Sequence, residues 1–121
     1  MTQPVAFIIE DNKHEAEIFA AAVEDAGFKP LVFRAGEAAL TRFEDLIPDL
    51  FVLDLHLPGI SGMEILSIIR MCERARKAAV IVVSGDATQT ELLRETADLV
   101  LVKPVGYQQL RELALRYKMV N

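Results

Sequence analysis

Five short apolar runs recur along the chain, and each is followed by a stretch in which apolar residues repeat at helical spacing. Continuous runs of Val, Ile, Leu and Phe are typical of strands that are buried on both faces of a parallel sheet. The predicted strands cover residues 5–9, 30–34, 49–54, 78–84 and 99–102. The predicted helices cover residues 12–25, 36–46, 62–74, 88–96 and 107–118.

The alternation of strands and helices predicts an α/β fold. Five βα units in succession form an open parallel sheet with helices on both faces and right-handed crossovers. We therefore expect a flavodoxin-like, three-layer (βα)5 domain whose five parallel strands lie in the order 2-1-3-4-5. At 121 residues the chain is near the commonest domain size, so we expect one domain over residues 1–121.

Composition and charge argue against several classes of partner. The chain is 52% hydrophobic and 26% charged, and its net charge is −5, so a basic face for nucleic acid or anionic membrane is not expected. Cys72 is the single cysteine, which excludes an internal disulfide. No apolar run approaches the ~18 residues that a membrane span requires. We expect a cytoplasmic protein that binds neither nucleic acid nor membrane.

Side chains with useful chemistry follow four of the five runs. Glu10 and Asp11 follow the first run, Asp54 ends the third, Ser84 ends the fourth, and Lys103 follows the fifth. The carboxyl ends of parallel strands meet at one edge of the sheet, and ligands bind there. We therefore expect these residues, which are far apart in sequence, to share one pocket.

The chemistry of this set favours a divalent cation and a phosphoryl group. Three carboxylates at close range repel one another, and a bound cation relieves the repulsion. Mg²⁺ prefers oxygen ligands and keeps several waters, so a few carboxylates suit it. Asp54 is then placed to attack a phosphoryl group as a nucleophile and to form an acyl phosphate. Lys103 and Ser84 offer a positive charge and a hydroxyl donor to the phosphoryl oxygens.

Each residue also has a plainer interpretation. Acidic residues before a helix are common caps, and an Asp at a strand end is often a turn residue. A single Lys-Pro or Ser-Gly pair is weak evidence for a site. The joint placement at four strand ends is what favours a functional site. The Lys103-Pro104 bond is a candidate for the cis isomer, which the sequence leaves open.

The motifs ED, D-x-x-x-P-G-x-x-G, S-G and K-P occur in this order along the chain. On these motifs, and over essentially all 121 residues, the chain resembles the receiver domain of bacterial two-component response regulators. The resemblance implies that Asp54 accepts a phosphoryl group from a sensor histidine kinase or a histidine phosphotransfer protein. It also implies a signalling domain rather than an enzyme, because such a domain catalyses only its own phosphorylation and dephosphorylation.

The resemblance assigns roles to the other site residues as well. It implies a Mg²⁺ or Mn²⁺ site formed by Glu10, Asp11, Asp54 and the backbone carbonyl of His56. By the same resemblance, Ser84 and Lys103 contact the phosphoryl group. The output is expected through a downstream protein target or output domain. Family members commonly dimerise through the face of the fourth helix, fifth strand and fifth helix, so a dimer through that face is possible here.

Three residues modify this expectation. Receiver domains usually carry Tyr or Phe three residues before the lysine, and this chain has Val100. Either Val100 is simply a core residue, or the signal leaves by a route other than the usual aromatic side chain. His56 and Asp86 lie two residues after Asp54 and Ser84, at the expected rim of the pocket. We expect this pair to set the lifetime of the phosphorylated form.

Two other functions stay open at this point. A pseudo-receiver would bind partners without phosphorylation, and Val100 is consistent with that function. The presence of the acidic pair, the acceptor Asp, the Ser and the Lys argues against it. A Mg²⁺-dependent phosphohydrolase would typically place a second Asp two residues after its nucleophile. His56 occupies that position, which weakens the case.

Overall fold

The computed structural model describes residues 3–120, except for the side chains of residues 90–92 and 119–120. The strands are β1 (Val5–Ile9), β2 (Lys29–Phe33), β3 (Leu50–Asp54), β4 (Ala79–Ser84) and β5 (Leu99–Val102). The helices are α1 (Lys13–Asp25), α2 (Gly36–Phe43), α3 (Gly62–Met71), α4 (Ala87–Leu93) and α5 (Tyr107–Val120), with a short 3₁₀ turn, η1 (Glu73–Ala75), before β4. No helix within this described part is both long and apolar enough to cross a lipid bilayer.

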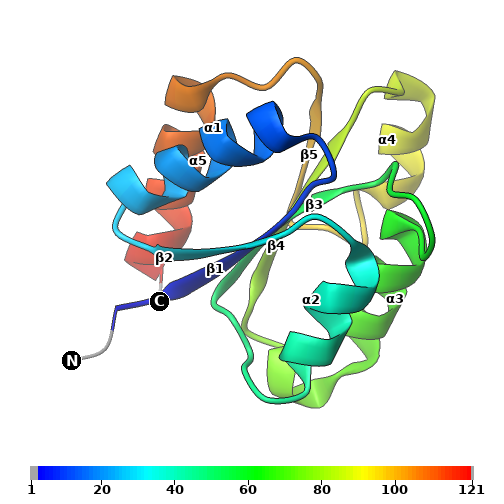
Figure 1. Cartoon of the computed structure of the whole chain (residues 1–121). Coiled ribbons are helices and arrows are strands. Elements are labelled where there is room, and N and C mark those ends of the chain that lie inside the picture. The colour runs from blue at the N-terminus through cyan, green and yellow to red at the C-terminus, as the bar shows by residue number, and fades with distance from the viewer. Residues whose placement is uncertain (1–2, 121) are drawn as a thin grey trace.

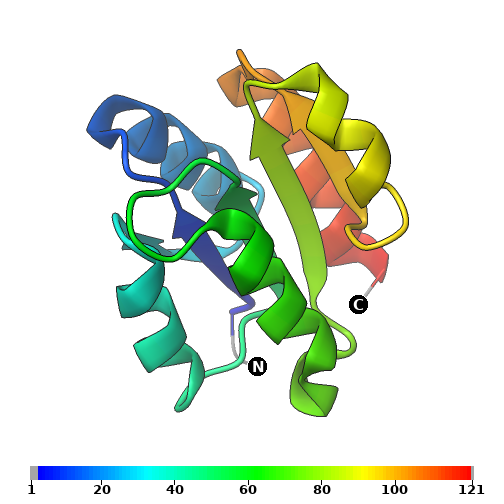
Figure 2. The same cartoon turned by 90° about the vertical axis from the view of Figure 1, so that its right-hand side faces the viewer.

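The strands form one parallel sheet in the order β2-β1-β3-β4-β5, which confirms the predicted topology. Helices α1 and α5 cover one face of the sheet, and α2, α3 and α4 cover the other (Figures 1 and 2). The result is the predicted three-layer arrangement. All five strands end at the same edge, which is where the polar residues of the sequence motifs lie.

Alternation along each strand sends neighbouring side chains to opposite faces, so the sheet separates two apolar cores. In β1, Phe7 and Ile9 join the core under α2, α3 and α4, whereas Ala6 and Ile8 join the core under α1 and α5. Strands β3 and β4 are buried along their whole length. This continuous burial explains why the sequence shows unbroken apolar runs rather than alternation.

Three predicted helices end earlier than the sequence pattern indicated. α4 ends at Leu93 rather than at residue 96. α2 ends at Phe43 rather than at residue 46, and the backbone amides of residues 45 and 46 then turn back to Arg42. The approach to Pro48 disfavours a longer helix because the residue before a proline avoids the helical region. α3 ends at Met71 rather than at residue 74, since Cys72 is extended and the η1 turn brings Ala75 into the core.

Candidate functional site

Three carboxylates gather at the carboxyl ends of β1 and β3. Side-chain oxygens of Glu10, Asp11 and Asp54 all lie within 4.8 Å of one another. Register pairs Ile9 with Leu53, so the residues that follow them meet at the sheet edge. Glu10 and Asp54 are 1% and 3% exposed, whereas Asp11 is open to solvent. This cluster of oxygen donors, which contains no sulfur or imidazole, fits Mg²⁺ or Mn²⁺.

Lys103 supplies the positive charge beside this cluster. Its Nζ lies 3.1 Å from Glu10 Oε1 and 3.4 Å from Asp54 Oδ2. It also lies 3.3 Å from Glu15 Oε1, a residue of the first turn of α1. The lysine follows β5, and its backbone N–H donates to the Ser84 carbonyl at 2.8 Å, which fixes the two strand ends together. One ammonium is therefore shared by three carboxylates.

Burial and like charge perturb the acid in the middle of the cluster. The pKa of Glu10 is raised from 4.5 to about 7, chiefly by burial and also by Asp54 beside it, while the Asn12 backbone N–H and Lys103 oppose the shift. Burial acts to lower the pKa of Lys103, but Glu10, Asp54 and Glu15 outweigh it, so that pKa rises. The site therefore keeps its ammonium charged, and three carboxylates around one ammonium leave a negative charge that an additional cation would offset.

Both oxygens of Asp54 have partners. The backbone N–H of His56 donates to Oδ1 at 3.0 Å, and Lys103 approaches Oδ2. The loop that follows depends on two glycines of the D-x-x-x-P-G-x-x-G motif. Gly59 has a φ of +76°, and a Cβ at Gly62 would lie 2.4 Å from the Asp54 carbonyl oxygen. The absence of a side chain at Gly62 allows the start of α3 to pack directly on the backbone at the end of β3.

Ser84 is fully buried, and its hydroxyl is bonded to the next turn of the chain. Its Oγ accepts from the Asp86 backbone N–H at 3.0 Å and lies 3.4 Å from the Asp86 carbonyl oxygen. Asp86 in turn caps α4, because its Oδ1 accepts from the Thr88 backbone N–H and hydroxyl at 2.9 and 2.6 Å. Ser84 is thus linked through Asp86 to the first turn of α4.

The two rim residues are within electrostatic reach of each other. The hydrogen bonds from Thr88 lower the pKa of Asp86, and the charge of His56 lowers it further. His56 is exposed. The role of the pair at the rim of the site stays a prediction.

Two further sequence features have a defined place. Val100 is half-buried, pairs with Val82 across β4 and β5, and packs against the core that α2, α3 and α4 cover. The Lys103-Pro104 peptide bond is cis, the isomer that the sequence had left open. Glu15 and its contact with Lys103 were not predicted. The sequence did indicate this contact in one way, because Glu15 lies in the first turn of a helix that starts beside the acidic cluster.

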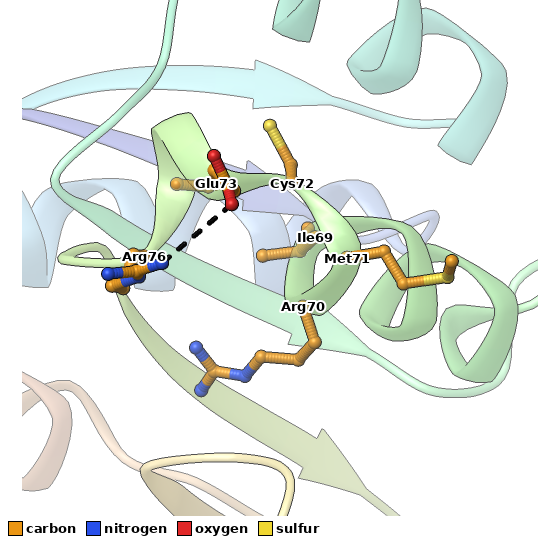
Figure 3. Close-up of a pocket in the computed structure, with 7 residues that line it drawn as sticks. Ile69, Arg70, Met71, Cys72, Glu73 and Arg76 are labelled. Carbon is orange, nitrogen blue, oxygen red and sulfur yellow. Dashed lines mark ion pairs between the residues drawn. The ribbon is translucent and has the colours of Figure 1, made fainter.

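A hollow lies at the end of the sheet opposite to the acidic cluster. A hollow of about 150 Å³ is bordered by the end of α3 and by η1, and Figure 3 shows its side chains. Glu73 and Arg76 form an exposed ion pair there at 4.0 Å, and Met71 is 85% exposed. The lining holds one carboxylate among apolar and arginine side chains, so it does not match the predicted site.

Comparisons with known proteins agree with the fold and with the motifs. The family model of the response regulator receiver domain matches residues 6–115. The probable methanogenesis regulatory protein FilR2 of Methanothrix harundinacea is 31% identical over 118 residues, which cover 88% of this chain and 76% of that protein. The polar-differentiation response regulator DivK of Brucella ovis is 29% identical over 120 residues, which cover 97% of both chains.

A solved structure shows the same likeness in three dimensions. The CheY-like response regulator receiver domain from Methylobacillus flagellatus has a TM-score of 0.84 and 26% sequence identity, over 96% of this chain and 99% of that one. The family match covers most of the chain, and the strand order and motif positions agree with it. The chain therefore belongs to the response regulator receiver domain family.

Proposed function

We propose that Asp54 is the phosphoacceptor of this receiver domain. The observation that carries the proposal is the position of its carboxylate, which belongs to the acidic cluster and lies 3.4 Å from the Lys103 ammonium. In the reaction, an Asp54 oxygen attacks the phosphorus of a phosphohistidine on a histidine kinase or histidine phosphotransfer protein. An O–P bond forms, the N–P bond breaks, and the donor imidazole leaves with the electron pair of that bond and takes a proton.

Glu10, Asp11 and Asp54 are the residues that would hold Mg²⁺ or Mn²⁺, together with the His56 backbone carbonyl. When bound, the cation supplies positive charge that offsets the charge of the phosphoryl group. Lys103 would pair with a phosphoryl oxygen, and the distance of 3.4 Å between its Nζ and Asp54 Oδ2 supports this role. The protein therefore contributes an acceptor, a cation site and a fixed positive charge on three strand ends.

Ser84 offers a route by which phosphorylation reaches the surface. To donate to a phosphoryl oxygen, its hydroxyl gives up the hydrogen bond that it donates to the Asp86 carbonyl oxygen at 3.4 Å. Asp86 also caps α4, so a change at Ser84 alters the start of that helix. This route needs no aromatic side chain at position 100, and it explains how a chain with Val100 still signals.

The output then depends on protein contacts, as receiver domains are signalling modules. We propose that residues 1–121 act as one cytoplasmic receiver domain whose surface at α4, β5 and α5 meets a downstream target, an output domain or a second copy. Val102 and Tyr107 are 45% and 37% exposed on that surface. The domain would change its own phosphorylation state and carry out no other catalysis.

Intact mass measurement tests the proposal. The protein is incubated with acetyl phosphate and Mg²⁺, beside Asp54→Ala and the control Asp45→Ala, which removes an exposed loop carboxylate. We expect one added phosphoryl group in the wild type and the control, none in Asp54→Ala, and none when a chelator removes the cation. No added mass in a folded wild type, with small donors or with phosphorylated histidine domains, would instead favour a pseudo-receiver that works by binding alone.

A further inference from the structure

The contact between Lys103 and Glu15 is the part of the site that the proposed function does not use. Glu15 lies on α1, whereas the other partners of Lys103 lie on β3 and directly after β1. Its carboxylate is 3.3 Å from Lys103 Nζ, nearly as close as the Glu10 carboxylate at 3.1 Å. The lysine that should pair with a phosphoryl group is therefore already paired with a residue outside the phosphoryl-transfer set.

Phosphorylation of Asp54 changes the charges around Lys103. Phosphorylation replaces the single charge of the Asp54 carboxylate with about −1.5 to −2 charges on the phosphoryl group, beside the carboxylates of Glu10 and Glu15. The three donors of the Lys103 ammonium face three carboxylates in the resting protein, and the more highly charged phosphoryl oxygens attract the ammonium more strongly than the Asp54 carboxylate does. The phosphoryl group therefore draws the ammonium away from the other two carboxylates, and like-charge repulsion acts on whichever carboxylate stays close.

Burial identifies Glu15 as the carboxylate that leaves. Its side chain is 32% exposed, whereas Glu10 is 1% exposed. Water can therefore solvate the Glu15 carboxylate as it rotates away, whereas the buried Glu10 carboxylate has no access to solvent. The backbone of Glu15 stays in place, since its N–H donates to Asn12 Oδ1 at 2.9 Å in the N-cap of α1. Side-chain rotation alone is enough to free the lysine.

We propose that Glu15 competes with the phosphoryl group for Lys103 and thereby limits the stability of the phosphorylated state. The inference rests on the proposed phosphoacceptor function. In the resting protein, Glu15 holds the lysine and balances its charge. In the phosphorylated protein, Glu15 is displaced, and its negative charge near the site disfavours the acyl phosphate. Glu15, a residue of α1, thus makes phosphorylation of Asp54 less favourable.

Binding of beryllofluoride, a non-covalent mimic of the phosphoryl group, gives the direct test. Glu15→Gln is compared with the wild type and with Glu17→Gln, a matched variant that removes an exposed carboxylate from the same helix. Calorimetric titration with excess Mg²⁺ should show about threefold to tenfold tighter binding for Glu15→Gln, and no change for Glu17→Gln. The phosphorylated fraction at limiting acetyl phosphate should rise in the same order.

The salt dependence of beryllofluoride binding distinguishes an electrostatic role of Glu15 from a structural one. Because Glu15 is partly exposed, its repulsion is screened, so the advantage of Glu15→Gln should shrink as NaCl is added. Equal beryllofluoride affinity in Glu15→Gln and Glu17→Gln would overturn the role of Glu15. Weaker binding of Mg²⁺ alone and of beryllofluoride in Glu15→Gln would also overturn it, since Glu15 would then help to hold the cation.

The test separates this inference from the proposed function. If the wild type takes up beryllofluoride and is phosphorylated, but the two glutamine variants behave alike, only the inference about Glu15 is wrong. If the wild type takes up neither beryllofluoride nor a phosphoryl group, the proposed function is wrong, and the competition at Lys103 is wrong with it. Thermal unfolding of each variant, in the absence of cation, confirms that the comparison is made between folded proteins.

Discussion

Replacing Glu10 with glutamine should stabilise the cation-free protein at alkaline pH. Glu10 is 1% exposed beside Asp54, and burial raises its pKa from 4.5 to about 7. The folded state therefore binds the Glu10 proton more tightly than the unfolded state does. The stability from this proton is fully present below about pH 4.5, falls as the pH rises to about 7, and is absent at higher pH.

The size of the effect follows from the pKa difference. A rise of about 2.5, from 4.5 to about 7, corresponds to about 3.4 kcal/mol at 1.36 kcal/mol for each pKa unit. Asp11 is open to solvent, so water that enters the pocket offsets part of this cost, and we expect about 2 kcal/mol. Glutamine keeps the shape of a protonated glutamate and can still accept from the Asn12 backbone N–H, which donates to Glu10 at 3.2 Å.

Urea unfolding followed by circular dichroism measures the effect, with a chelator present. At about pH 5 the wild type and Glu10→Gln should have similar free energies of unfolding, and at about pH 8 the variant should be about 2 kcal/mol more stable. Excess Mg²⁺ should stabilise the wild type at pH 8 more than the variant and so close the gap. Parallel pH profiles for the two proteins in chelator would refute the reasoning.

The remaining predictions concern the cation, the glycine contact, the buried serine and the rim. Mg²⁺ affinity, measured by calorimetry, should fall as the pH drops below about 7, because protons compete for Glu10. Gly62→Ala should lower the free energy of unfolding in urea by about 2 kcal/mol or more, because the added Cβ would lie 2.4 Å from the Asp54 carbonyl oxygen. The control Gly85→Ala should leave the free energy of unfolding nearly unchanged, because no atom lies within 4 Å of its added Cβ. Ser84→Ala should cost about 1 kcal/mol in the same assay, from the lost hydrogen bonds to Asp86, and should leave Mg²⁺ affinity unchanged. Replacing both His56 and Asp86 with alanine should change the hydrolysis rate of the acyl phosphate, followed by intact mass, and an unchanged rate would exclude a role for the pair.

The fold could be predicted well because two-sided burial leaves a strong pattern in the sequence. β1 and β5 were predicted with their observed limits, since apolar runs and polar neighbours mark both ends. The ends of α2 and α3 were less clear in the sequence. The apolar spacing continues past Phe43 and Met71, and only tertiary packing, such as the burial of Ala75, decides that the helices stop there.

Part of the site could be predicted for a similar reason. Parallel topology brings strand ends together, so Glu10, Asp54 and Lys103 were expected to meet, and they do. The topology does not determine where a helix side chain points, so the Glu15 contact was missed. The link from Ser84 through Asp86 to α4 was also missed, because it depends on hydrogen bonds to the backbone that residue types alone do not specify.

The ion pair between Lys103 and Glu10 joins residues that are 93 positions apart in the chain. Contacts of such long sequence separation are slow to form, because the loop between them must close first. During synthesis, the acidic cluster of β1 and β3 is made long before its lysine leaves the ribosome. The ammonium therefore reaches the acidic cluster only when β5 is added to the edge of the sheet, and a chain that stops short of that strand lacks the charge that we propose assists phosphoryl transfer. Under the proposed function, competence to receive a phosphoryl group thus reports that β5 has joined β1, β3 and β4 in the sheet.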